Sequence, residues 1–542
     1  MTQFINRKED IVQEAIDGLI ATSGGRIARL DGYPHIRVVL RNDWDRSRVA
    51  LVSGGGSGHE PAHAGFVGPG MLTAAVCGDV FASPSVDAVL AGILAVTGPA
   101  GCLLIVKNYT GDRLNFGLAA ERARAFGLNV SMVVVDDDIA LPDLPQARGV
   151  AGTLFVHKIA GALAEAGASL EDVSVTATRV IAGTRSIGMS LDTCTVPGAL
   201  KEDRIARGKA ELGLGIHGEA GVEQVDYSDA RSAMAIVSQK LGAFLAPGGN
   251  YVALLNNLGG ASVLEMSVLA HELAHSDLAG RISHIVGPAT MMTSLDMRGF
   301  SVSLCPATPE TLAALETTTP LHNWPGVARL SKPDIIDLPD GLRPIRPLAS
   351  QHPPTRDFLI RCCEILIAAE ADLNALDAKT GDGDTGSTLA GAAKALIKAM
   401  DRLPLADHTQ LYRAIGQELS ETMGGSSGVL LAIFFAAAGD AAASGQTMGE
   451  ALQAGLARMQ EIGGARPGDR TMIDALEPAL RVLPQGIAAA ARAARNGANG
   501  TAEMVQARAG RAAYINTEQL RGQVDPGAEA VARLFEQLVA PV

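Results

Sequence analysis

The period of the apolar residues changes at one proline-rich stretch, and this change divides the chain. Before residue 336, short β-branched runs such as RVALVS, CLLIVK and YVALLNN alternate with alanine-rich stretches and end in Gly, Asn or Asp. This alternation is typical of α/β architecture, in which ligands bind at the carboxyl ends of the strands. We therefore predict a sheet-centred domain over residues 1–335.

The remainder of the chain has a helical pattern. Residues 336–355, IDLPDGLRPIRPLASQHPPT, are rich in proline and lack periodicity, which predicts a linker. From residue 356 onward, Ala, Leu and Met recur at three- and four-residue spacing, as in TLAGAAKALIKAM. We predict an all-α domain over residues 356–542, and a chain of 542 residues is long enough for more than one core.

Composition narrows the class of protein. A net charge of −13 without a long basic run argues against a nucleic-acid or anionic-membrane partner. The six cysteines lack CxxC spacing, which favours reduced thiols. The charged start MTQFINRKED does not resemble a secretory signal, and the run VLLAIFFAAA, about ten residues, is too short to span a bilayer. We expect a cytoplasmic globular protein.

An acidic loop is the first candidate site. The stretch LDAKTGDGDTGSTLAG places Asp377, Asp382 and Asp384 within eight residues. Its G-x-G-x-x-G pattern follows a helical segment rather than a strand, and a calcium loop would need Glu where Ala393 stands, so neither motif fits. Carboxylates beside a helix N-terminus suit Mg²⁺ that bridges to phosphates, but a capped, solvated acidic loop explains the residues equally well.

Three further loops of the second half carry polar or glycine-rich sequences. MGGSSGVLL contains Ser426 and Ser427, GARPGDRTMID contains Arg470, and RGQVDPGAEA lies near the end. Each is compatible with a simple interhelical turn, although the Arg470 guanidinium suits a phosphate. Together they could close one end of a bundle around a nucleotide, with Mg²⁺ offsetting the acidity of the protein. None contains the G-K-[ST] of a P-loop.

Three segments of the first half combine glycines with titratable side chains. SGGGSGHEPAH carries His59, IVKNYTGD carries Lys107 and Asp112, and GLGIHGEAG carries His217. Glycine permits close approach of the backbone to a ligand, and histidine exchanges protons near neutral pH. Each residue alone is also explained as surface decoration, or as a helix cap in the case of Asp112. Their positions after predicted strands indicate one site, without identifying its reaction.

These motifs resemble those of one family. SGGGSGHEPAHAGFVG, KNYTGDRLNFG, GLGIHGE, NNLGG, MTSLDMRGFS, the D-x4-G-D-G-D-x-G loop, GDRTMIDAL and DPGA occur in this order in the single-chain, ATP-dependent dihydroxyacetone kinases. The resemblance covers nearly the whole chain. It implies a two-lobed α/β domain that binds a ketose, followed by an antiparallel helix barrel that binds a nucleotide.

The resemblance also implies roles for individual residues. The histidine matching His217 forms a covalent hemiaminal with the ketone carbon, while Asp112 and His59 contact the hydroxyl that receives the phosphoryl group. The residues expected to bind the ketose are Gly56, Ser57, Gly58, His59, Lys107 and Asp112. Those expected to bind ATP are Asp384, Thr385, Gly386, Ser387, Ser426, Ser427, Arg470, Thr471, Asp525, Pro526 and Gly527. Asp377, Asp382 and Asp384 would hold Mg²⁺, with two ions expected, and the protein would be a homodimer.

One stretch departs from the family pattern and leaves alternatives open. Where the family commonly shows SYLGxRSxG, this chain reads AAYINTEQLRGQVDPG and keeps Tyr514, Gly522 and the DPG turn. A four-carbon ketose such as erythrulose is therefore the alternative substrate. Because some animal members also split FAD into a cyclic nucleotide and AMP, FAD-AMP lyase activity is a further alternative. A ketose-sensing regulatory protein could lose the acidic loop, which is intact here.

Overall fold

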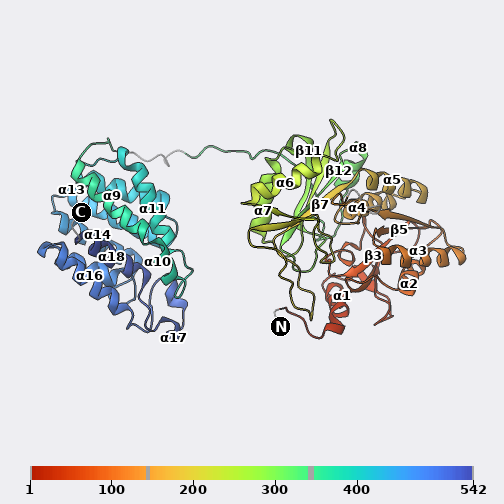
Figure 1. Cartoon of the computed structure of the whole chain (residues 1–542), viewed down its shortest axis with the longest axis horizontal. Helices are drawn as coiled ribbons and strands as arrows, with labels where there is room; N and C mark the ends of the chain where they lie inside the picture. The colour runs from red at the N-terminus through yellow and green to blue at the C-terminus, as the bar shows by residue number, and fades with distance from the viewer. Residues whose placement is uncertain (1–2, 142–146, 340–346, 540–542) are drawn as a thin grey trace. The chain divides into compact units, whose positions relative to one another are not determined.

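The structure, a computed structural model, describes residues 3–141, 147–339 and 347–539. It divides into two compact units, Met1–Ile335 and Ile336–Val542 (Figure 1). Part of the predicted linker, residues 340–346, lies outside the described residues. A helix begins at Pro353, inside the span predicted as linker, because proline is tolerated in the first turn of a helix.

The first unit contains a six-stranded sheet in the order β1-β2-β4-β3-β5-β6. Its strands are β1 Ile27–Arg29, β2 Val38–Arg41, β3 Ala50–Ser57, β4 Ala74–Val80, β5 Cys102–Lys107 and β6 Val130–Val135. The four strands from β4 to β6 in this order are parallel, and β3 and β5 are neighbours in register, with Ser53 opposite Ile105. The carboxyl ends of β3 and β5 therefore lie side by side.

A second sheet of seven strands follows the order β13-β11-β10-β12-β7-β8-β9. Its strands are β7 Arg185–Ser190, β8 Lys209–Leu212, β9 Glu223–Asp226, β10 Tyr251–Asn257, β11 Ile282–Thr290, β12 Gly299–Pro306 and β13 Val327–Arg329. Only β10 and β11 pair in parallel. A bridge between Asp138, just beyond β6, and Ser186 of β7 links the two sheets.

Helices separate and cover these sheets, as Figure 1 shows. They are α1 Ile11–Ala21, α2 Val86–Val96, α3 Thr110–Ala125, α4 Thr153–Glu165, α5 Leu170–Gly183, α6 Ala230–Gly242, α7 Val263–Ala274 and α8 Pro309–Glu316. α4 and α5 lie between the sheets in a core that contains Leu103 of one and Leu254 of the other. α2 and α3 cover the far face of the first sheet, and α6 and α7 that of the second. The predicted α/β architecture is confirmed.

In the second unit, every regular element among the described residues is helical. The α-helices are α9 Pro353–Ala368, α10 Glu370–Asp377, α11 Thr385–Ala399, α12 His408–Thr422, α13 Gly425–Ala443, α14 Met448–Gly463, α15 Ile473–Val482, α16 Ile487–Thr501, α17 Thr517–Leu520 and α18 Pro526–Val539. The long helices pack in chain order, and α18 returns to α9 and α10, so they form a closed ring. From α11 to α16, successive neighbours are joined by short connections, as is typical of antiparallel neighbours in an up-and-down bundle.

One of these helices is longer than its sequence suggested. α13 has 19 residues, since the Gly, Ser and Ala residues around the apolar run continue the helix. Within the described part of the chain, it is the one helix long and apolar enough to cross a membrane by length and composition. Core helices of other proteins pass the same test, and α13 packs between α12 and α14 in the ring.

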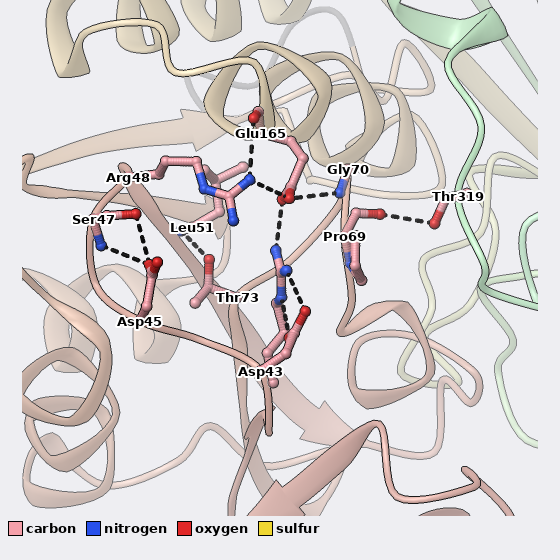
Figure 2. Close-up of polar contacts among 11 residues, drawn as sticks. Asp43, Asp45, Ser47, Arg48, Leu51, Pro69, Gly70, Thr73, Glu165 and Thr319 are labelled. Atoms are coloured by element: carbon pink, nitrogen blue, oxygen red, sulfur yellow. Dashed lines mark hydrogen bonds and ion pairs between the residues drawn. The ribbon is translucent and has the colours of Figure 1, made fainter.

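The end of α4 is fixed by a partly buried ion-pair cluster around Glu165, shown in Figure 2. Arg41, whose side chain is 3% exposed, donates to Glu165 Oε2 at 2.6 Å, and Arg48 pairs with Glu165 Oε1. Arg41 also donates twice to Asp43, and Gly70 N donates to Glu165. Burial alone would raise the pKa of the Glu165 carboxyl, but the hydrogen bond and charge of Arg41 lower it overall. The cluster thus ties the helix between the sheets to the edge of the first sheet.

We predict that Glu165→Gln lowers the free energy of unfolding of the first unit by about 1–3 kcal/mol, because the buried Arg41 guanidinium loses one of its two carboxylate partners and Arg48 loses its own. Urea unfolding followed by tryptophan fluorescence measures this unit alone, since both tryptophans, Trp44 and Trp324, lie in it. The carboxylate stabilises the fold above the unfolded-state pKa of about 4.3, so the difference from wild type should shrink as the pH falls below that value.

The matched control is Asp87→Asn, which removes a carboxylate from the exposed pair with Arg122. Exposed pairs contribute little, so this variant should unfold like wild type. Equal effects of the two substitutions would contradict the prediction.

Candidate functional site

The carboxyl end of β3 and the loop that follows it lie against Phe81 and Ala82, and these contacts require glycines there. A Cβ on Gly56 would lie 2.7 Å from the backbone N of Ala82. Gly58 has φ +100°, and a Cβ there would lie 2.8 Å from Cε1 of Phe81. The Ser57 hydroxyl donates to Gly78 O at 2.8 Å, so this side chain serves the loop itself. The loop thus offers mainly backbone groups to a ligand.

His59, which follows this loop, is fully buried and held in one tautomer. Its Nδ1 lies 2.8 Å from the carbonyl oxygen of Thr293, which can only accept, so Nδ1–H is the donor. Nε2 is then unprotonated, and it is buried without a partner among the described residues. Burial lowers the pKa of His59 well below its usual range, and the charge of Lys107 adds to this. His59 can therefore accept a proton or hydrogen bond from a ligand.

His217, in the loop after β8, is surrounded by aromatic rings. The ring centroids of Tyr109, His59 and Phe81 lie 4.3, 4.8 and 5.5 Å from that of His217. The backbone N of His217 donates to Glu219 Oε2 at 2.8 Å, and its Nδ1 lies 3.4 Å from Glu219 Oε1. A carboxylate facing Nδ1 favours the proton on that nitrogen, which leaves the lone pair of Nε2 for a ligand.

The contact between the two side chains also changes the pKa of Glu219. Burial alone would raise the pKa of Glu219, but the hydrogen bond of His217 lowers it to about 2. Glu219 remains ionised at any physiological pH and can hold the imidazole in place. The sequence prediction missed it, as it missed Tyr109 and Phe81, although Glu219 stands two residues after His217 in the quoted GLGIHGEAG.

Lys107 and Asp112 converge on the glycine-rich end of β3. A Cβ on Gly55 would lie 2.8 Å from Lys107 Nζ and 3.4 Å from Asp112 Oδ2. Both side chains are buried, and Asp112 Oδ1 has no hydrogen-bond partner within the described ranges. The side chain does not cap α3, whose N-cap is Tyr109, so the capping interpretation fails. A buried carboxylate oxygen without a partner can accept a hydrogen bond from a hydroxyl of a ligand.

A cavity of about 390 Å³ adjoins this group on the side of α1. It is lined by Val12 and Ile16 of α1, by Gly55–Ser57 and by His63, and its lining does not include His217 or Asp112. The cavity therefore lies beside the convergent polar atoms and not among them.

In the second unit, the acidic loop brings its three carboxylates together. One oxygen each of Asp377, Asp382 and Asp384 lies within 4.8 Å of the others. The buried Asp377 accepts from the backbone N of Asp384 at 3.0 Å and of Thr385 at 3.1 Å, which folds the loop over it. Asp384 is the N-cap of α11 but makes no side-chain capping bond. Three hard oxygen donors at this spacing fit Mg²⁺.

The start of α11 is tied to α10. A Cβ on Gly386 would lie 2.1 Å from Glu370 O, so only glycine permits this approach. The backbone N of Ser387 donates to Asn374 Oδ1 at 3.0 Å, and its hydroxyl donates to Glu370 at 3.1 Å. The Ser387 side chain is thus engaged in the helix pair.

Arg470 is the most unusual cation of the second unit. It is 1% exposed, and its Nη2 donates to Gln523 O at 2.8 Å. Nε and Nη1 are buried without a partner in the described structure. Burial lowers the pKa of Arg470, and the charge of Asp525 counters this. A buried guanidinium with two unused donors fits a phosphate.

The other predicted nucleotide residues have simpler surroundings. The backbone N of Thr471 donates to Asp474 at 2.8 Å. Asp525 accepts from the backbone N of Ala528 at 2.8 Å, so it caps α18 and supports the capped-turn interpretation of this loop. Ser426 and Ser427 are exposed in the first turn of α13.

The alternating directions of the helices gather these residues. The α10–α11, α12–α13, α14–α15 and α16–α18 connections all lie at one end of an up-and-down ring. The predicted residues fall on these connections or on the helix ends beside them: Asp377, Asp382, Asp384, Thr385, Gly386, Ser387, Ser426, Ser427, Arg470, Thr471, Asp525, Pro526 and Gly527. This end of the ring therefore combines the carboxylate cluster with a buried guanidinium.

Comparison with known proteins agrees with both units. Residues 17–322 match the Dak1 domain and residues 379–540 the DAK2 domain. Dihydroxyacetone kinase of Citrobacter freundii is 48% identical, over 99% of this chain and 98% of its own. Triokinase/FMN cyclase of Homo sapiens is 40% identical, over 99% and 98%. A putative 3,4-dihydroxy-2-butanone kinase of Solanum lycopersicum is 42% identical, over 98% and 97%.

Solved structures of dihydroxyacetone kinase also match the chain over nearly its whole length. The crystal structure of the C. freundii dihydroxyacetone kinase in its native form matches with a TM-score of 0.70 and 46% identity, covering 99% of both chains. The complex of that enzyme with AMP-PNP and Mg²⁺ matches with a TM-score of 0.69. The chain thus belongs to the dihydroxyacetone kinase family and is a kinase of that type.

Proposed function

We propose that this kinase transfers the γ-phosphoryl group of ATP to a terminal hydroxyl of a short-chain ketose, with dihydroxyacetone as substrate. Residues 1–335 bind the ketose, residues 336–355 link the domains, and residues 356–542 bind the nucleotide. The observation that carries the proposal is a pair of buried acceptors that have no partner among the described residues. They are His59 Nε2, on a ring 4.8 Å from that of His217, and Asp112 Oδ1, on a side chain that converges with Lys107 on Gly55.

The ketose is held through its carbonyl group. The Nε2 lone pair of His217 attacks the ketone carbon, a C–N bond forms, and the π electrons move to the oxygen, which takes up a proton as the imidazole loses that of Nδ1. Glu219 faces Nδ1 and favours this direction. A covalent tether converts the encounter with a small molecule into a positioned reaction and discriminates against glycerol, which lacks a carbonyl.

The terminal hydroxyl then meets the two acceptors. Asp112 accepts its proton as the oxygen attacks the γ-phosphorus, and His59 Nε2 orients it. Lys107 donates to the ketose beside the backbone of Gly56, Ser57 and Gly58.

The nucleotide is held by the end of the helical ring that bears the acidic loop. Asp377, Asp382 and Asp384 would hold two Mg²⁺ ions, which when bound neutralise the triphosphate. Arg470 donates to a phosphate through Nε and Nη1, and residues Asp384–Ser387, Ser426, Ser427, Thr471 and Asp525–Gly527 surround the nucleotide. The AMP-PNP and Mg²⁺ complex of the C. freundii relative supports the use of ATP and Mg²⁺.

We also propose a cytoplasmic homodimer in which the helical domain of one subunit serves the ketose site of the other. The seventeen residues 336–352 that precede α9, extended as polyproline II, would reach on the order of 50 Å. Tethering holds the two domains at an effective concentration of order millimolar, so no separate docking affinity is needed.

We predict that Asp382→Asn and Asp384→Asn each lower kcat/KM for Mg-ATP on the order of a hundredfold or more at limiting Mg²⁺, because each removes one charged ligand. Steady-state kinetics measures the loss, and electron paramagnetic resonance of added Mn²⁺ measures the affinity of the site. Asp372→Asn, a change on α10 that breaks an ion pair with Arg533 of α18, is the control and should keep wild-type values. Wild-type activity and Mn²⁺ affinity in both loop variants would contradict the metal assignment.

We predict that His217→Ala abolishes the mass increment that the ketose adds to the intact protein, whereas Asp112→Asn keeps the increment and loses turnover. The tether requires the imidazole, while proton acceptance requires the carboxylate. Intact-protein mass spectrometry and kinetics on the same samples separate the two roles. An adduct that persists in His217→Ala would move the tether to another residue, with His59 the next candidate.

We predict multiple turnovers with ATP as the sole donor, without a phosphoprotein. A substrate panel decides among the alternatives: dihydroxyacetone, erythrulose and 3,4-dihydroxy-2-butanone with Mg-ATP, and FAD with Mn²⁺ for the lyase reaction. The names of the tomato and human relatives motivate the last two arms. If the enzyme does not turn over repeatedly with ATP, the donor assignment is contradicted. If kcat/KM is higher for a four-carbon ketone than for dihydroxyacetone, the four-carbon ketone is the preferred substrate.

The cross-subunit arrangement has its own test. Mixing His217→Ala with Asp382→Asn protein under conditions of subunit exchange should restore activity, since one subunit keeps an intact ketose site and the other an intact nucleotide site. Mixed dimers that form without regaining activity count against it.

A further inference from the structure

A buried histidine that the proposed reaction does not use contacts Lys107. His63, in the loop between β3 and β4, places Nε2 2.7 Å from Lys107 Nζ, and both side chains are buried. An ammonium group can only donate, so Nε2 accepts and the proton of this imidazole lies on Nδ1. Burial lowers the pKa of His63 well below its usual range, and the charge of Lys107 adds to this, so the imidazole is neutral.

The contact accounts for the direction of the Lys107 side chain. Of the three N–H donors of the ammonium, one goes to His63 Nε2 and one approaches Gly54 O at 3.5 Å. The third is left for a ligand on the side of Gly55, where Asp112 also converges. A lysine stem has four rotatable bonds and loses much rotamer entropy when it is held in one geometry, so two fixed acceptors determine where the third donor points.

We propose that His63 is a positioning residue for Lys107: its neutral Nε2 holds the ammonium so that the remaining N–H is directed at the ketose. The inference rests on the proposed function, in which Lys107 binds the ketose. His63 itself touches no reacting atom.

A packing role is the alternative, and the surroundings of His63 make it testable. The His63 ring lies edge-on to that of His157, with centroids 5.2 Å apart, and lines the cavity beside α1. If packing were its role, the volume of a substitute would matter and the position of its acceptor atom would not. The amide oxygen of glutamine reaches the position of Nε2, whereas that of asparagine reaches only the position of Nδ1. His63→Gln and His63→Asn therefore form a matched pair of similar polarity.

The pH dependence of kcat/KM for the ketose distinguishes the two roles, because a packing role would not change it. The titratable groups that face Lys107 are Asp112 from α3, His59 and His63 from the loops after β3, and His157 from α4. Burial lowers the pKa of Lys107, and the charge of Asp112 opposes this. Loss of a neutral acceptor disfavours the ammonium form and lowers that pKa further. The alkaline limb of kcat/KM for the ketose should then move to lower pH.

The experiment compares the full-length wild type, His63→Gln and His63→Asn with dihydroxyacetone at saturating Mg-ATP. In His63→Asn we expect kcat/KM for the ketose to fall roughly tenfold to a hundredfold, which is the effect of losing a hydrogen bond to a charged group. We also expect the alkaline limb of its pH profile to lie about one pH unit lower than in wild type. His63→Gln should lie within about threefold of wild type, with its limb unmoved.

The same defect should disappear in a Lys107→Met background, because the two residues act as a unit. The proposal is overturned if the two His63 variants behave alike, if the limb of His63→Asn stays in place, or if the defect persists without Lys107. A wild type that does not phosphorylate the ketose overturns the proposed function itself. An active wild type with indistinguishable variants overturns only the role of His63.

Discussion

The parallel pairing of β3 with β5 is the constraint on which the first site depends. Parallel register carries Gly55–Ser57 and Lys107 to the same edge of the sheet, and the connections that leave this edge supply His59 and Asp112. The second sheet adds His217 and the carbonyl of Thr293 from its own loops. Without that register, the glycine-rich backbone and the two charged side chains would not converge.

Burial gives these side chains their chemistry. His59 and Lys107 are almost fully removed from solvent, and burial lowers the pKa of both. Asp112 is equally buried and keeps an unused acceptor among the described residues. The same principle applies to Arg470 at the other site, where two donors of a buried guanidinium remain unused. Unsatisfied buried atoms cost stability in the free protein, and a ligand that pairs with them recovers that cost on binding.

Much of this architecture was readable in the sequence. Apolar runs that end in Gly or Asp marked β3, β5 and β10, and the change of period marked the helical unit. The partners of the site residues were not readable. Glu219 is near His217 in sequence, but Thr293, Phe81 and Tyr109 reach the site through loop geometry that carries no periodic signal. The extent of α13 was also missed, because Gly and Ser residues at its start resemble a loop in sequence.

The position of α4 and α5 has a mechanical consequence. Both sheets pack on these two helices, and Leu103 and Leu254 belong to one continuous core. A hinge motion that parted the lobes would expose that core to water, so bending between the lobes costs much more free energy than a rearrangement of surface loops. The geometry around His217 is therefore preset before the ketose arrives. Any gating of access falls to surface loops, whose rearrangement breaks few buried contacts.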